Sequence, residues 1–134
     1  MSTREPRIVV TSTDMERLRT LIDTTAGDRA DALDAELMRA EVVEPSQIPP
    51  DVVTMNSRVV YRDEESHETR EVTLSYPQDA SLEQGRISVL APVGAALLGL
   101  SVGQEIEWQL PGGKSRRLRV LSVTYQPQAA GHCH

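Results

Sequence analysis

Aromatic residues are scarce in this chain. It has three Tyr, one Trp and no Phe among 134 residues, which is 3% of the sequence. Proteins that hold single-stranded nucleic acid stack its bases on aromatic side chains, so this shortage disfavours such a site. The hydrophobic core must be built instead from Val, Leu, Ile and Met, and at 39% hydrophobic residues the chain supports one modest core.

Cysteine and long apolar runs are equally sparse. Cys133 is the single cysteine, so the chain can form no intrachain disulfide, which fits a reducing cytoplasm. No apolar stretch at the N-terminus resembles a signal peptide, and no run approaches the length of a membrane span. These absences predict a soluble cytoplasmic protein without a membrane partner.

Positive charge is in deficit throughout. Lys and Arg number 14 against 20 Asp and Glu, and the formal net charge is −6. Because nucleic-acid contacts depend on positive charge, we expect no direct sequence-specific nucleic-acid binding and favour a protein partner. One basic cluster stands out, and we interpret it as a solvated strand, with an acidic partner patch or RNA as alternatives; it comprises Lys114, Arg116, Arg117 and Arg119.

The N-terminal third has helical periodicity. Residues 7–11 form either a short strand or an extended lead-in, and Thr13 to Glu16 has the pattern of a capping box. Apolar residues follow at helical spacing on two segments separated by residues 24–27: Leu18, Leu21 and Ile22, then Ala30, Leu33, Leu37 and Met38. We predict an antiparallel helical hairpin, a short coiled coil, over residues 1–44, and a Pro-bearing linker over 45–50 that ends the second helix.

From residue 51 the hydrophobic period changes to two. Alternation predicts strands around Val59, Val72, Ile87 and Ile106 and a last strand over residues 117–125, each with one buried face, as in an antiparallel sheet. A short helix is expected over residues 92–98, with Pro at its first turn and Gly just past its end. The chain is thus predicted to be α+β, with a sheet domain over 51–126 and a polar tail over 127–134.

Residues 86–113 resemble the C-terminal domain of the Gre transcript-cleavage factors. The resemblance lies in a strand containing Ile87-Ser88, a turn Ala91-Pro92-Val93-Gly94, the following Ala96-Leu97-Leu98-Gly99, and a Pro-Gly hairpin. Residues 51–59 and 126–131 further resemble the short-armed relatives of the Gre factors, the regulators of nucleoside diphosphate kinase (Rnk). This resemblance implies a helical hairpin followed by a small FKBP-like sheet domain with one short helix.

The resemblance also implies a partner. In Gre factors this part of the C-terminal domain faces the rim of the secondary channel of RNA polymerase, on the beta-prime subunit. The matching residues here are Ala91, Pro92, Val93 and Gly94, which we predict to bind the polymerase, whereas Leu97 and Leu98 are expected in the core. We predict no small-molecule substrate.

Gre factors hold a catalytic metal with paired acidic residues at the tip of a long arm. Here the first helix spans about a dozen residues, roughly 20 Å, and the tip lacks that acidic pair. The hairpin-tip residues Asp23, Asp28 and Asp31 are therefore expected to be solvated, with no catalytic residue, metal or cofactor. At the other end of the chain, His132, Cys133 and His134 are too close together to complete a tetrahedral zinc site, so only adventitious metal binding is expected.

The predicted function is a non-catalytic transcription regulator that competes with Gre factors without stimulating transcript cleavage. Any effect on nucleoside diphosphate kinase levels would be indirect. One alternative is an FKBP-like prolyl isomerase or folding helper, although such sites need aromatic walls that this chain hardly provides. Another is a short-armed cleavage factor, which would require the three tip aspartates to reach a metal.

Overall fold

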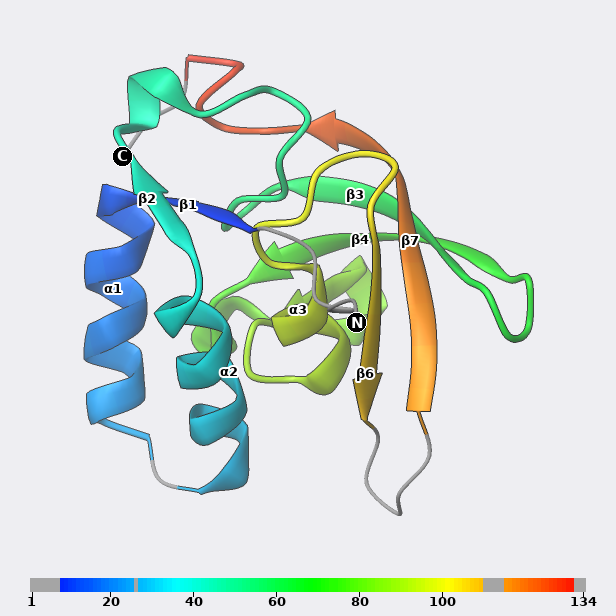
Figure 1. Ribbon diagram of the computed structural model, residues 1–134, viewed down its shortest axis with the longest axis horizontal. Coiled ribbons are helices and arrows are strands. Elements are labelled where there is room, and N and C mark those ends of the chain that lie inside the picture. The colour runs from blue at the N-terminus through cyan, green and yellow to red at the C-terminus, as the bar shows by residue number, and fades with distance from the viewer. Residues whose placement is uncertain (1–7, 26, 110–114, 132–134) are drawn as a thin grey trace, which may run out of the picture.

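The computed structural model describes residues 8–25, 27–109 and 115–131, which form a mixed helix and sheet structure (Figure 1). Its helices are α1 (Ser12–Asp23), α2 (Asp28–Met38) and α3 (Pro92–Leu97). Its strands are β1 (Val9–Thr11), β2 (Glu41–Val43), β3 (Arg58–Asp63), β4 (Thr69–Ser75), β5 (Arg86–Ser88), β6 (Glu105–Gln109) and β7 (Ser115–Tyr125). No helix among the described residues is both long and apolar enough to cross a membrane.

Helix α1 begins two residues earlier than the capping box predicts. Its N-cap is Thr11, whose Oγ1 accepts a hydrogen bond from the backbone N–H of Asp14 at 3.1 Å. Thr11 has extended backbone because it also ends β1, so the strand places the capping hydroxyl. The predicted cap at Thr13 is therefore wrong. The predicted stripe is present, with Leu18 fully buried.

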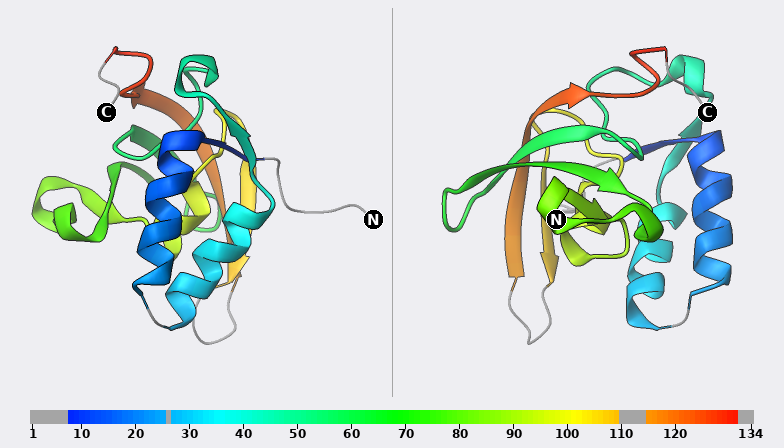
Figure 2. Two further views of the ribbon diagram at one scale, coloured as in Figure 1. Left: turned by 90° about the vertical axis from the view of Figure 1, so that its left-hand side faces the viewer. Right: turned by 180° about the vertical axis from the view of Figure 1, so that it is seen from behind.

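Helix α2 lies beside α1 and runs in the opposite direction (Figures 1 and 2). Ala30, Leu33 and Leu37 are buried as predicted, but Met38 is 74% exposed and does not belong to the buried stripe. The reason is that α2 ends at Met38, well before the prolines. The chain then turns into β2, a strand that the periodicity did not reveal, and β2 pairs in parallel with β1.

The main sheet has the strand order β5-β4-β3-β7-β6. Its β3–β4, β3–β7 and β6–β7 pairs are antiparallel, but β4 and β5 are parallel, so the prediction of a wholly antiparallel sheet is wrong at this edge. The reason is the connection over residues 76–85, which contains two 3-10 turns, Pro77–Asp79 and Leu82–Gln84, and returns the chain before β5 starts. On β3, Val59 and Tyr61 are buried and Arg58 is exposed, as the alternation predicts.

One buried cluster unites the N-terminal helices with the sheet, and its members include Ile8, Leu18, Leu33, Val53 and Leu97. Gly99 allows the N-terminal segment to approach closely: its φ is +82°, and a Cβ there would lie 2.7 Å from the Cβ of Ile8. The Val9 N–H also donates to the Gly99 carbonyl at 3.1 Å. The division of the chain into segments at residues 44, 50 and 126 stays a prediction. The N-terminal helices and the sheet contribute to the same core.

Candidate functional site

Helix α3 presents a small half-exposed surface on a buried base. Ala91 is its N-cap and Pro92 occupies the first turn, where the missing N–H costs no hydrogen bond. Ala91, Pro92 and Val93 are half-buried, whereas every residue from Gly94 to Leu100 is buried. The Ala95 N–H donates to the Ala91 carbonyl at 2.9 Å, which holds this first turn. We call Ala91, Pro92 and Val93 the α3 surface.

Gly94 positions this surface. A Cβ at Gly94 would lie 2.1 Å from the carbonyl oxygen of Ser88, closer than any side chain can approach, so glycine lets α3 rest directly on the end of β5. Of the four residues predicted to bind a partner, Gly94 is the one that is buried. Leu97 and Leu98 are 0% and 1% exposed and belong to the core, as expected.

The three tip aspartates are divided between the two N-terminal helices. Asp23 ends α1 and is exposed, Asp28 opens α2, and Asp31 is exposed one turn later. Within the described part of the chain, no group of three or more His, Cys, Asp or Glu side chains could hold a metal ion. At 12 residues, α1 is about 18 Å long.

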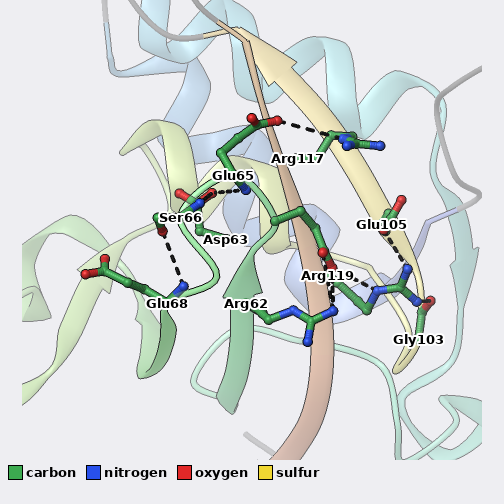
Figure 3. Close-up of polar contacts among 10 residues, drawn as sticks. Arg62, Asp63, Glu65, Ser66, Glu68, Gly103, Glu105, Arg117 and Arg119 are labelled. Atoms are coloured by element: carbon green, nitrogen blue, oxygen red, sulfur yellow. Dashed lines mark hydrogen bonds and ion pairs between the residues drawn. The ribbon is translucent and has the colours of Figure 1, made fainter.

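Arg117 and Arg119 of the basic cluster lie beside an acidic turn of the same chain (Figure 3). Arg119 Nε lies 3.0 Å from Glu64 Oε2, and its Nη2 lies 2.6 Å from Glu105 Oε2. Arg116 pairs with Asp63, and Arg117 Nε lies 3.9 Å from Glu65 Oε2. The acidic run at residues 63–65, at the end of β3 and in the turn that follows, is the sequence feature that could have predicted these ion pairs. The pairing of β3 with β7 brings this run next to the arginines of β7.

These contacts change the titration of the network. Hydrogen bonding from Arg119 holds the pKa of Glu64 below its usual value. Hydrogen bonding to Glu64 and Glu105 correspondingly raises the pKa of Arg119. The three arginines of the cluster are thus engaged inside the molecule, which does not suit a nucleic-acid surface. Lys114, the Pro111–Gly113 turn and His132 to His134 lie outside the described residues.

A buried carboxylate joins α1 to the segment that leads into β3. Asp14 is 6% exposed, and its Oδ2 accepts a hydrogen bond from the Met55 backbone N–H at 3.1 Å. Burial raises the pKa of Asp14, although this hydrogen bond and the nearby charge of Arg17 oppose the effect. The sequence did not indicate this contact with Met55, because Asp14 lies within residues 13–16, which have the pattern of a capping box.

Two adjoining hollows lie beneath the connection over residues 76–85. The first has a volume of about 560 Å³ and is lined by Asn56, Arg58, Thr73, Ser75, Asp79, Gln84, Arg86 and Tyr125. The second has a volume of about 540 Å³ and is lined by Arg17, Thr20, Leu21, Thr24, Asn56, Tyr76, Gln78 and Asp79. Neither has the aromatic walls of a prolyl isomerase site. Local sequence pattern indicates neither hollow, although the alternation around Val59 and Ile87 is consistent with Arg58 and Arg86 on the outer face of the sheet.

Two families match this chain along most of its length. Residues 48–125 match the family described as "Transcription elongation factor, GreA/GreB, C-term". Residues 6–43 match the family described as "Rnk N-terminus". The second match covers β1, α1, α2 and β2, and the first covers the main sheet and α3.

Individual relatives agree with these families. The chain is 49% identical to the regulator of nucleoside diphosphate kinase of Escherichia coli K12, over 94% of this chain and 95% of that protein. It is 33% identical to the transcription elongation factor GreA of Thermodesulfovibrio yellowstonii, over 73% of this chain and 61% of that protein. A solved structure described as a prokaryotic transcription elongation factor GreA/GreB from Nitrosomonas europaea is 53% identical, with a TM-score of 0.72 over 90% of this chain and 100% of that chain.

These matches confirm the resemblance to the Gre factors and to the regulators of nucleoside diphosphate kinase, and the Pro92 turn and residues 51–59 lie within the matched segment 48–125. They also explain why a short helix pair precedes a sheet domain of the elongation-factor type. The chain belongs to the GreA/GreB family of transcription elongation factors and, within it, to the group of regulators of nucleoside diphosphate kinase.

Proposed function

We propose that this protein is a non-catalytic transcription regulator that binds RNA polymerase through the α3 surface. The proposed contact is the rim of the secondary channel on the beta-prime subunit. The proposal is supported by family membership and, within the molecule, by one observation: Ala91, Pro92 and Val93 are half-exposed on a base that is buried from Gly94 onward. Because that base is packed, little conformational entropy is lost when a partner contacts the turn.

The composition of the α3 surface suits a helix of a partner protein. Ala, Pro and Val side chains are small and have few rotatable bonds, so they bury apolar area with little loss of side-chain freedom. None of the three carries charge, which makes the contact weakly dependent on salt. Gly94 contributes by holding α3 against Ser88, rather than by touching the partner.

The paired helices α1 and α2 support a regulator without cleavage activity. We propose that they act as a short helical hairpin that projects toward the channel from an FKBP-like sheet domain. Asp23 and Asp31 are exposed and lie on different helices, so they offer no packed acidic pair of the kind that holds a catalytic metal. By occupying the rim, the protein would exclude Gre factors, and nucleoside diphosphate kinase levels would change indirectly through altered transcription.

Competition for core RNA polymerase tests the proposal. A fluorescently labelled Gre factor would be displaced by this protein and much less by Pro92→Asp, which places a charge in the apolar contact. Leu82→Asp is the matched control, because Leu82 is 87% exposed and lies on the 3-10 turn Leu82–Gln84, outside the α3 surface. Equal displacement by all three proteins would move the interface elsewhere. No displacement by any of them would refute polymerase binding at a shared site.

A cleavage assay on stalled elongation complexes tests the absence of catalysis. We expect no stimulation of transcript cleavage by the wild-type protein at saturating concentration. Stimulation that disappears when Asp23, Asp28 and Asp31 are all changed to Ala would support the cleavage-factor alternative instead.

A further inference from the structure

Three arginines among the described residues of this acidic protein form no ion pair, although the charge of one of them, Arg17, acts on Asp14. Within the described part of the chain, Arg17, Arg58 and Arg86 form no ion pair, and all three line the two hollows beneath residues 76–85. Every other arginine whose side chain is described is paired: Arg19, Arg39, Arg62, Arg70, Arg116, Arg117 and Arg119. Because acidic residues are in excess, most arginines are expected to find a carboxylate. The three that form no ion pair all line two adjoining hollows.

The pairing register places two of these arginines in one row. Arg58 on β3 lies opposite Thr73 on β4, and Thr73 lies opposite Arg86 on β5. Residues that are directly paired across strands point to the same face of a sheet, and here their neighbours Val59 and Leu74 are buried on the other face. The Cα atoms of the two arginines are therefore about two strand spacings apart, roughly 10 Å. At that separation two long side chains can contact one ligand above Thr73.

The connection over residues 76–85 turns this row into a pocket. It projects from the body of the molecule beside β4 and β5 (Figure 2). It adds Asp79 and Gln84 to the lining. The volume of about 560 Å³ lies within the range of small-molecule sites, about 300–1,000 Å³. A hollow of this kind is better suited to a small ligand than to the flat surface of a folded partner.

The neutral lining residues supply further donors. Within the described residues, the side chains of Asn56, Thr73 and Gln84 make no hydrogen bond to the protein. A tetrahedral phosphate accepts hydrogen bonds in several directions, whereas a single carboxylate is satisfied by one arginine fork. Two guanidinium groups on opposite sides of the Thr73 hydroxyl, with two amides elsewhere in the lining, suit the several acceptor directions of a phosphate.

We propose that Arg58 and Arg86 form a binding site for a small phosphate-bearing molecule, with Thr73 at its floor. Arg17 in the adjoining hollow extends the positive field, since the two hollows share Asn56 and Asp79. Asp79 is the opposing charge, so it limits affinity in the free protein. The site shares no residue with the α3 surface, and the inference does not depend on polymerase binding.

Titration with inorganic pyrophosphate tests the proposal. Backbone amide NMR shifts would be followed at constant ionic strength, with inorganic phosphate and citrate as comparison ligands. We expect saturable shifts centred on Asn56, Thr73 and Arg86, with pyrophosphate binding more tightly than phosphate. Citrate is expected to bind more weakly than pyrophosphate, because planar carboxylates match the site less well.

Variants identify the groups responsible. Arg58→Gln and Arg86→Gln should each weaken pyrophosphate binding about tenfold, since each removes charge-assisted hydrogen bonds. Arg70→Gln is the matched control: it removes the same charge from an exposed arginine that pairs with Glu68, and it should leave binding unchanged. Asp79→Asn should strengthen binding severalfold. Unperturbed amide spectra outside the pocket show that each variant is folded, as expected for exposed side chains.

Three results would overturn the proposal. Shifts that stay linear in pyrophosphate up to about 10 mM would mean that no site exists, because a built site saturates. Equal weakening by Arg70→Gln would mean that only overall charge is sensed. Citrate binding as tightly as pyrophosphate would contradict the assignment to a phosphate-bearing ligand.

Discussion

Removing the carboxylate of Asp14 tests the link between α1 and the sheet. Asp14 Oδ2 accepts the Met55 N–H at 3.1 Å, and both residues are buried. Asp14→Ala leaves that backbone donor without a partner and out of contact with water. A buried donor left unsatisfied costs about 1–3 kcal/mol, so we expect the free energy of unfolding to fall by that amount.

Asp14→Asn separates the hydrogen bond from the charge. The amide oxygen of Asn can accept the same Met55 N–H, while the burial of a charge, which raises the pKa of Asp14, is removed. At pH 7 this variant should therefore equal or exceed the wild type in stability. That result would show that the hydrogen bond between Asp14 and Met55, and not the charge of Asp14, stabilises the contact between α1 and the segment before β3.

The pH dependence has a definite sign. The pKa of Asp14 is raised in the folded state, so folded protein binds the proton more tightly than unfolded protein does. The contribution of Asp14 is fully present below the unfolded pKa and is lost as the pH rises through the folded pKa. Asp14→Asn should remove that loss, so the stability difference between variant and wild type should grow from pH 4 to pH 7.

Urea unfolding followed by circular dichroism at several pH values measures all three proteins. The slope against urea should be unchanged, because the surface exposed on unfolding is the same. A free energy of unfolding for Asp14→Ala within about 0.5 kcal/mol of the wild type, the usual size of a surface effect, would refute a structural role for this hydrogen bond. So would an Asp14→Asn variant that is as destabilised as Asp14→Ala.

Three further predictions concern the cap, the α3 base and the acidic turn. Thr11→Ala should destabilise by about 1 kcal/mol through loss of the N-cap, and Thr13→Ala by clearly less, as urea unfolding of both variants would show. Gly94→Ala should destabilise by at least about 2 kcal/mol, because its Cβ would lie 2.1 Å from the Ser88 carbonyl and α3 must move; it should also weaken polymerase binding. Glu64 has a lowered pKa, so its contribution is present above the unfolded pKa and lost as the pH falls through the folded pKa. Glu64→Gln should therefore flatten the acid side of the stability profile, measured by thermal unfolding from pH 3 to 6, and an unchanged profile would contradict this.

Local patterns predicted most of the elements. The stripe of Leu18, Leu33 and Leu37, the alternation of Val59 and Tyr61, and the Pro92 start of α3 each depend on near neighbours, and each is confirmed. Family resemblance at the Pro92 turn depended on the same local residues. By contrast, the end of α2 at Met38 depends on β2 pairing with β1, a contact between segments 32 residues apart in the register Val9↔Glu41. Propensity alone could not place that end.

The features that were missed all depend on contacts between residues far apart in the sequence. Nothing near Asp14 in the sequence indicates Met55 as its partner, and a Thr-x-x-Glu pattern nearby offered a local explanation that the fold does not use. Likewise, alternation places Arg58 and Arg86 on the outer face but says nothing of their common row. That row requires a parallel β4–β5 pair, which the connection over residues 76–85 makes possible. An antiparallel β5 in its place would pair β4 with different residues, and the two arginines would not flank Thr73. The connection over residues 76–85 therefore explains both the parallel β4–β5 pair, which was not predicted, and the pocket. A variant in which this connection is shortened should lose the parallel pair and the pyrophosphate site together.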